Sequence, residues 1–476
     1  MKRLPLACLL AALAAALPLL LAATRPPQPN AKAGPGLPGP SARPSVKRVA
    51  WRSHARPRAS QSHLAAAWRS PERQRADPAG NRSPHPKRPS GATKAKSGEP
   101  HLFVWAMESR HPHAAMEMKP GVRSPQGLGR DFLAVFNVAP GAKPFGKLVA
   151  MLPVGQASMA HHTSYALPPD GHLYANDWLG NQTYVFNLHN PLHPRLLRQF
   201  GSVGNFSYPH SFIYLPNGNT LATFQYSGGF NHATGGLVEF APDGHVVRSV
   251  SAAVAGYPNI RPYSLAVVPA LDRVVSSSAD MMGAQPSRVA QVWRLSDLTL
   301  LKTMVLPGSD PRTLPDVADS SEPRVLADGR TVVVPDFYCG LYRVDGLAGN
   351  NPTLRAIYDP GYRFCEVPVV EGQYLIWNTQ SGHAILSIDM HDPEHPHEVS
   401  RILLPPSNDP HWIAAEPGGD RLVITGYGAM ETEVLFAAIN RSTGQLRLLP
   451  YKLNLTRRWP NGWTGSAIPH GAVFGN

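Results

Sequence analysis

The sequence predicts an all-β fold, a seven-bladed β-propeller, and three observations support it. A hairpin pattern of a polar residue, a short apolar strand, a turn and a second strand occurs six times between residues 162 and 426. Successive copies begin 43 to 59 residues apart, and two further strand-like stretches lie between them. Four strands in a repeat of this length are typical of a propeller blade. Helical periodicity is nearly absent from the chain.

Residues 1–23 have the pattern of a secretory signal peptide. Lys2 and Arg3 precede an apolar run of Leu and Ala that extends from Leu4 to Ala23. An uncleaved membrane anchor is the alternative, because about 20 apolar residues can span a bilayer. We expect cleavage and export, to the periplasm or to the outside of the cell.

Residues 24–100 are predicted to be a disordered linker rich in Pro and Arg. Residues 25–100 hold 16 Lys and Arg against 3 Asp and Glu, whereas residues 101–476 hold 27 against 29. The linker has few aliphatic residues to bury, so it cannot offset its ordering entropy. The formal charge of +13 therefore belongs to the tail, and the nearly neutral remainder argues against nucleic-acid binding. Weak attraction of the linker to a membrane or cell wall is the alternative to a solvated spacer.

Residues 101–476 are predicted to form the propeller as one domain. Six blades follow from the six hairpins, which begin at His162, His210, Tyr263, Glu322, Cys365 and His411. The seventh is expected to combine both ends of the domain. Outer strands would come from residues 132–138 and 146–155, and inner strands from "HLFVWAM" at residue 101 or "GSAIPHGAVFG" at residue 465. Closing the ring in this way leaves no exposed sheet edge.

The residues that begin the hairpins are the candidate site. The innermost strand of each blade lines the central channel, so these residues are expected to converge at one mouth. Neutral imidazole suits copper, zinc, iron and nickel. The candidate metal ligands are His161, His162, His210 and His411. The alternative is that these imidazoles fill a polar channel and bind water.

Three further residues are candidates for catalysis at this mouth. Cys339 lies in a loop that opens on the same face, so we expect it near Cys365 of the next blade; the two could form a disulfide or act as soft metal ligands. Glu322 could pair with Arg324, either for catalysis or as an ion pair that holds two blades together. The nucleophile elbow, the zinc-protease helix and the P-loop are all absent from the sequence.

With these repeats in place, the chain resembles the selenium-binding protein family, whose bacterial members include methanethiol oxidases, and in particular its bacterial selenium-binding protein-related branch. The resemblance spans about residues 101–440. It rests on "HLFVWAM", "DFLAVFNV", "HHTSYALPPDG", "YPHSFIYLPNGNTLATFQ", "RPYSLAVVPALDRVV", "EPRVLADGRTV", "CGLYRV" and "DPHWIAAEPGGDRLVITGYGA".

The resemblance implies a seven-bladed propeller with copper held by His161, His162, His210 and His411, another transition metal being the alternative. It also implies an exported enzyme that oxidises a small thiol such as methanethiol with O₂ to an aldehyde, sulfide and peroxide. The family's Cys-Ser-Ser-Cys stretch is replaced here by "TSYALPP". Selenium binding through that stretch is therefore not implied, and Cys339 and Cys365 are the candidates to substitute in thiol chemistry.

Two other functions remain open from the sequence. One is a non-catalytic extracellular propeller that binds or scaffolds a partner. The other is a hydrolase similar to lactonases, with a divalent metal at the same mouth. The sequence does not specify an oligomeric state or identify the small-molecule substrate.

Overall fold

The computed structural model describes residues 100–109, 129–155, 159–281, 287–307, 319–426 and 432–475. The predicted signal peptide and nearly all of the predicted linker lie outside these ranges. Within them the chain forms strands β1 to β29, one short 3₁₀ turn (Pro269–Leu271) and no α-helix. Accordingly, no described segment is a helix of the length and hydropathy needed to cross a bilayer.

The described strands form seven antiparallel sheets, six of four strands and one of five. Three of the four-stranded blades, given from inner to outer strand, are β4 (Ala160–Thr163), β5 (His172–Asp177), β6 (Gln182–Asn187) and β7 (Arg195–Phe200); β8 (Phe206–Tyr214), β9 (Thr220–Ser227), β10 (Ala233–Phe240) and β11 (Val246–Ser251); and β12 (Pro262–Val268), β13 (Arg273–Ser278), β14 (Val289–Arg294) and β15 (Leu300–Val305). The other three are β16 (Arg324–Val325), β17 (Val332–Pro335), β18 (Leu341–Asp345) and β19 (Thr353–Tyr358); β20 (Val369–Glu371), β21 (Tyr374–Thr379), β22 (Ala384–Asp389) and β23 (His397–Leu403); and β24 (Pro410–Ala415), β25 (Arg421–Gly426), β26 (Glu433–Ile439) and β27 (Leu446–Asn454).

The remaining blade is built from both ends of the domain. Its strands are β28 (Thr456–Arg458), β29 (Thr464–Gly475), β1 (His101–Glu108), β2 (Asp131–Asn137) and β3 (Lys147–Val154), in this order. β29 is the inner strand and β1 pairs with it, so both segments that the sequence offered are used. The prediction that the two ends close the ring is confirmed.

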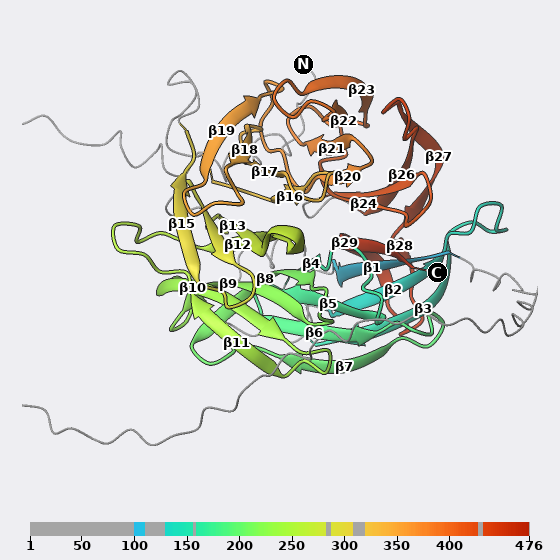
Figure 1. The fold of residues 1–476 in the computed structure, drawn as a ribbon. Coiled ribbons are helices and arrows are strands. Elements are labelled where there is room, and N and C mark those ends of the chain that lie inside the picture. The colour runs from blue at the N-terminus through green and yellow to red at the C-terminus, as the bar shows by residue number, and fades with distance from the viewer. Residues whose placement is uncertain are drawn as a thin grey trace, which may run out of the picture. The chain divides into compact units, whose positions relative to one another are not determined.

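The inner strands contact one another around a closed ring. Their order is β29, β4, β8, β12, β16, β20, β24 and back to β29. The fourth strands, such as β7, β11, β19 and β27, lie at the perimeter of the molecule (Figure 1). This arrangement is the predicted seven-bladed propeller, and it brings one inner strand of every blade to the centre.

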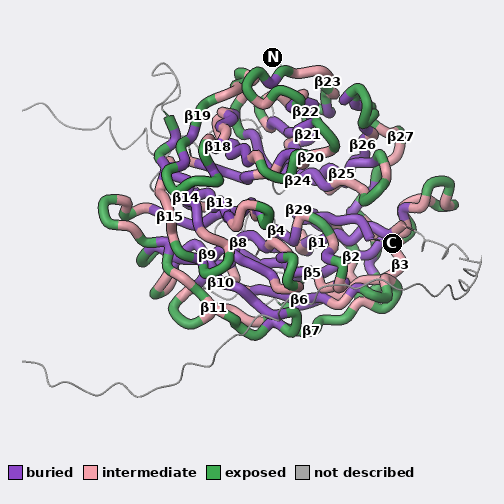
Figure 2. Tube along the Cα trace, viewed as in Figure 1, coloured by how far each residue is buried: buried purple, intermediate pink, exposed green. Residues whose placement is uncertain are grey.

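The hydrophobic core lies between the blades, and alternation along β1 shows why. Leu102 and Val104 pack with residues of the β24–β27 blade, including Trp412 and Phe436. Phe103 and its alternate neighbours pack instead with residues of the β4–β7 blade. Successive side chains of a strand point to opposite faces, so each sheet supplies apolar residues to two interfaces. Burial is accordingly nearly continuous over inner strands such as β4 and β24, and exposed residues gather at the outer loops (Figure 2).

Candidate metal centre

Five histidines from four consecutive blades meet at the centre of the described propeller. They are His161 and His162 on β4, His210 on β8, His411 on β24 and His470 on β29. We call these five residues the histidine cluster. Every member is buried, with at most 4% of its surface exposed.

The imidazole rings are in close contact. His161 stacks on His162 with ring centroids 4.1 Å apart and planes 3° from parallel. The ring of His470 lies 4.2 Å from that of His161 and 4.4 Å from that of His411. His210 lies 4.4 Å from His162, whose Nε2 is 3.4 Å from Nε2 of His411. The predicted convergence of His161, His162, His210 and His411 is therefore present in the structure.

A shift in strand register positions each of these histidines. On β4, Ala160 and Thr163 pair with Asp177 and Ala175, so two residues on the inner strand face one on its neighbour. The same kind of shift occurs at His210 on β8, at His411 on β24 and at His470 on β29. β-bulges turn side chains away from the regular alternation, and they are common beside functional sites. Here they direct the imidazoles toward the channel axis.

Side chains from the second strand hold these bulges and link neighbouring blades. Asn176 on β5 accepts a hydrogen bond from the backbone N–H of His162 at 2.7 Å and donates one to the carbonyl of Pro209 in the next blade. Asn378 on β21 likewise donates to the carbonyl of His411 at 2.7 Å. Thr425 on β25 donates to the carbonyl of His470. The carbonyls beside the site are thus fixed by buried hydrogen bonds between blades.

Burial keeps the histidine cluster neutral. Desolvation lowers the pKa of His210 and that of His411 to about 3. Burial first, and then the neighbouring imidazoles, hold the pKa of His161 and His162 well below the usual value. Neutral imidazole is the form that binds a metal ion, because its lone pair is available.

Several ring nitrogens also lack the partner that burial normally requires. Both ring nitrogens of His161 are buried without a hydrogen bond, and so is Nε2 of His210. The Nδ1–H of His210 donates to the carbonyl of Tyr263 at 2.8 Å, which leaves Nε2 with the lone pair. Buried polar atoms without partners are costly unless a ligand satisfies them. The donor set therefore fits a transition metal ion.

Glu322 joins the cluster from the opposite side of the ring. It is 1% exposed, and its Oε1 lies 3.6 Å from Nδ1 of His162. Its Oε2 accepts hydrogen bonds from Ser264 at 2.5 Å, from Arg324 at 3.3 Å and from the hydroxyl of Tyr165. The predicted ion pair of Glu322 with Arg324 is therefore formed, within one blade, and Arg324 also donates a hydrogen bond to the carbonyl of Pro368 in the next blade.

Glu366, and not Cys365, takes the site position in the β20–β23 blade. Its Oε2 lies 3.5 Å from Nδ1 of His411. Burial, followed by the negative charge of Glu322, raises the pKa of Glu366 to about 8. The hairpin pattern predicts Cys365 at this position, one residue too early, because it does not show which residue turns toward the axis.

Cys339 and Cys365 form a buried disulfide. Their Cα atoms are 5.0 Å apart, and they join adjacent blades as predicted. Both are fully buried in an apolar cluster with Leu341 and Trp377. In the disulfide neither sulfur is a thiolate, so the structure selects the disulfide over the alternative of soft metal ligands. The predicted catalytic role of these cysteines would need the bond to be opened first.

His470 is the member of the histidine cluster that the hairpin pattern does not predict. It lies within "GSAIPHGAVFG", a stretch recognised as a candidate inner strand, but no hairpin follows it. Its pairing partner is β1, at the other end of the domain. Alignment of this stretch with the other inner strands would have placed His470 level with His411.

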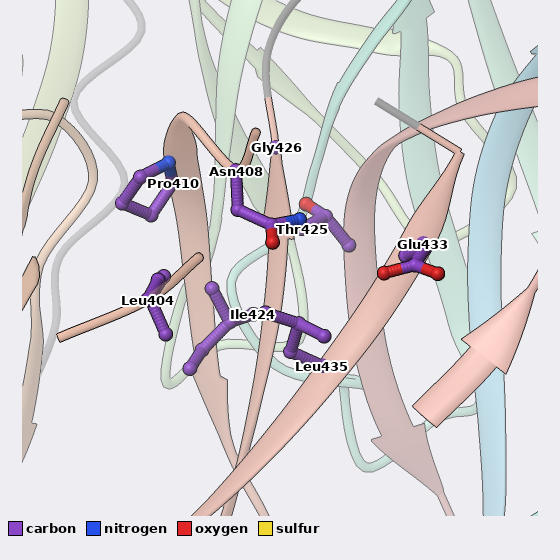
Figure 3. A pocket seen from close by; sticks show the side chains of 8 residues that line it. All are labelled: Leu404, Asn408, Pro410, Ile424, Thr425, Gly426, Glu433 and Leu435. Carbon is purple, nitrogen blue, oxygen red and sulfur yellow. The ribbon is translucent and has the colours of Figure 1, made fainter. Parts of the chain in front are cut away.

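The potential ligand atoms fall into two groups among the described residues. One comprises His161, His162, His411 and His470, and the other comprises His162, His210 and Glu322. Within each group the atoms lie within 4.8 Å of one another. A small pocket in the β24–β27 blade is separate from them: residues such as Asn408, Thr425 and Glu433 line it, and no member of the histidine cluster does (Figure 3).

Comparison with known proteins supports the predicted resemblance. No family model matches the chain. The methanethiol oxidase of Hyphomicrobium sp. is 25% identical over 183 residues, which make up 38% of this chain and 38% of that protein. The match therefore spans well under half of that relative's length.

Two solved structures share the fold. A hypothetical selenium-binding protein from Sulfolobus tokodaii superposes with a TM-score of 0.58 at 13% identity, covering 80% of this chain and 94% of that one. A putative 6-phosphogluconolactonase from Bacteroides uniformis gives 0.50 at 11% identity, covering 79% and 100%. At these identities the structures show the fold alone. Together with the sequence match, they confirm the resemblance to the selenium-binding protein and methanethiol oxidase family.

Proposed function

We propose that this chain, similar in sequence to a methanethiol oxidase and in fold to a selenium-binding protein, is a copper-dependent oxidase of a small thiol. The observation that carries the proposal is the histidine cluster: five buried, neutral imidazoles in mutual contact, in which both ring nitrogens of His161 and Nε2 of His210 have no hydrogen-bond partner. A cluster of this kind is costly to fold without a ligand. Imidazole ligands suit copper, and copper would exchange electrons between the thiol and O₂.

The proposed reaction balances for methanethiol. One thiol, one O₂ and one water give formaldehyde, hydrogen sulfide and hydrogen peroxide. The carbon is oxidised and O₂ is reduced by two electrons, and the C–S bond is hydrolysed. The thiol must lose its proton, so the site needs a group that can accept one.

Glu322 is the residue that we propose for proton transfer. Its Oε1 is buried without a hydrogen bond, beside Nδ1 of His162. The other oxygen is held by Ser264, Arg324 and Tyr165, so the carboxylate cannot turn away from the imidazole. Tyr165 is itself fixed between the ring of Trp412, stacked at 5.3 Å, and the guanidinium of Arg324 at 4.0 Å. Tyr165 would thus act as a positioning residue for Glu322.

We also propose that the protein is exported to the periplasm or secreted. Residues 1–23 support this by their pattern. The disulfide between Cys339 and Cys365 supports it independently, since disulfides persist in oxidising compartments. Weak attraction of the basic linker to a membrane or cell wall remains part of this proposal.

The test uses the mature protein, stripped of metal and then loaded with copper. We expect methanethiol-dependent O₂ uptake with release of peroxide, reduced by at least about tenfold in His470→Ala. His189→Ala, at an exposed histidine of an outer turn, is the matched control and should keep full activity. Copper binding without thiol oxidation would overturn the oxidase and favour a binding module. Hydrolysis of a lactone in place of thiol oxidation would favour the hydrolase alternative.

A further inference from the structure

The two groups of ligand atoms share one residue, His162, and use different atoms of it. Nε2 of His162 points to His411, with 3.4 Å between the two Nε2 atoms. Nδ1 points to Glu322, 3.6 Å from Oε1. The two nitrogens of an imidazole ring diverge, so one ring cannot direct both at a single ion. Each ring nitrogen of His162 therefore faces its own set of donors.

The second set consists of three buried atoms that have no hydrogen-bond partner. These atoms are Nδ1 of His162, Nε2 of His210 and Oε1 of Glu322, which come from three different blades. Other groups hold the remaining polar atoms of His210 and Glu322. Nδ1 of His210 binds the carbonyl of Tyr263, and Oε2 of Glu322 accepts from Ser264 and Arg324. Supporting bonds of this kind fix the orientation of metal ligands.

One ion cannot satisfy all of these donors. Bonds from imidazole and carboxylate to a transition metal are about 2.0–2.2 Å long, so donor atoms around one ion lie within about 4 Å of one another. Four imidazoles already complete a coordination sphere in the first group, and His210 and Glu322 belong only to the second. A single copper ion in the first group would leave the second group buried and unsatisfied.

We propose that this chain binds two metal ions, bridged by the imidazole ring of His162. The first ion lies among His161, His162, His411 and His470. The second is held by His162, His210 and Glu322, a set of two imidazoles and one carboxylate that suits a divalent zinc or iron ion as well as copper. The inference rests on the proposed function only for the identity of the first ion. When the second ion is bound, Glu322 is its ligand and no longer the proton acceptor proposed above. Bridging requires that His162 lose its ring proton when the second ion binds.

Metal titration of the stripped, folded protein tests the proposal. We expect wild type to bind two equivalents of copper(II) per chain, measured by elemental mass spectrometry after removal of loosely bound ions. His210→Ala and Glu322→Gln should each bind one equivalent, and so should His470→Ala, which loses the other ion. His189→Ala should bind two. One equivalent in wild type, or two in both His210→Ala and Glu322→Gln, would overturn the second site.

Electron paramagnetic resonance tests the bridge without relying on any variant. Two copper(II) ions joined by an imidazolate are magnetically coupled, so the doubly loaded wild type should show a copper signal well below two spins per chain. With zinc in one site and copper in the other, a full single-copper signal is expected. Two full, uncoupled copper signals would overturn the bridge.

The outcome separates this inference from the proposed function. Thiol oxidation with one bound ion would overturn the two-ion site and leave the oxidase standing. Two coupled ions without thiol oxidation would do the reverse. For each variant, an unchanged thermal unfolding midpoint in the metal-free state shows that a lost equivalent reflects a lost ligand.

Discussion

The two sides of the central ring differ in chemistry although they share one architecture. Four consecutive inner strands, β24, β29, β4 and β8, present histidines. The next three blades instead place Tyr263 on β12, Glu322 just before β16 and Glu366 just before β20. We call these the imidazole side and the carboxylate side. The bulge that places Tyr263 on β12 is of the same kind as the bulge at His210. The blade repeat thus fixes where a side chain points, and the residue type alone decides what it can bind.

The two sides also differ in how they are held together. β16 and β20 are the shortest inner strands, with two and three residues, whereas β29 has twelve. Few ladder hydrogen bonds can therefore hold the inner edge of these two blades. The disulfide between Cys339 and Cys365 joins these same blades. We infer that on the carboxylate side a covalent bond replaces part of the stability that longer strands give the imidazole side.

Of the changes considered, removal of the disulfide should lower the stability of the carboxylate side the most. Cys339→Ala combined with Cys365→Ala opens a link between residues 26 positions apart, which should lower the free energy of unfolding by about 3.5 kcal/mol. Metal content should not change, because the histidine cluster does not include either cysteine. Urea unfolding and elemental analysis measure the two quantities. A loss of less than about 1 kcal/mol would show that the short strands do not depend on the bond.

The next prediction concerns a buried acid on the carboxylate side. Burial, only partly offset by hydrogen bonds from Gly340 and Tyr342, raises the pKa of Asp336 to about 6, against 3.8 in an unfolded chain. Between these values the folded state keeps a proton that the unfolded state has released. Stability contributed by this group is therefore present below pH 3.8 and is lost as pH rises to about 6.

Asp336→Asn should remove that pH dependence. From pH 4 to pH 7, wild type should lose up to about 3 kcal/mol of unfolding free energy relative to the variant, which has no carboxyl group to ionise. Urea unfolding at both pH values measures it. A difference that stays constant with pH would mean that Asp336 ionises in the folded protein as it does in water.

The propeller and four members of the histidine cluster can be predicted from the sequence for one reason. Each of those histidines begins a local hairpin, and a hairpin can be recognised within about 16 residues of sequence. His470 pairs with β1 across nearly the whole domain, so no local pattern marks it. Glu366 was missed by one position, because a register shift in a strand cannot be seen in the residues themselves. Nothing in the sequence pattern marks Tyr165, because its hydroxyl contacts Ser211, Ser264 and Glu322, which belong to three other blades.

A smaller loss of stability is expected when a hydrogen bond that holds a bulge is removed, and its consequence for metal binding should differ between the two sides. Thr425→Val removes the hydroxyl that binds the carbonyl of His470, and Ser277→Ala removes the hydroxyl that accepts the N–H of Ser264. Each should cost about 1–2 kcal/mol, because a buried backbone group loses its partner. Only Thr425→Val should also weaken binding of the ion among His161, His162, His411 and His470, since it alone releases a strand that carries one of these four proposed ligands. Equal metal affinity in both variants would contradict the role given to Thr425.

The smallest effect is expected at histidines outside the ring. His391 and His395 lie in an outer turn, exposed by 62% and 81%, and each is paired with a neighbouring aspartate through Nδ1. Such exposed pairs contribute little, so His391→Ala combined with His395→Ala should change the free energy of unfolding by less than about 0.5 kcal/mol. Metal content should stay at the wild-type value, because these imidazoles offer no buried, converging nitrogens. A metal ion lost from this double variant would mean that histidine content, and not the position that the inner-strand bulges impose, determines where this chain binds metal.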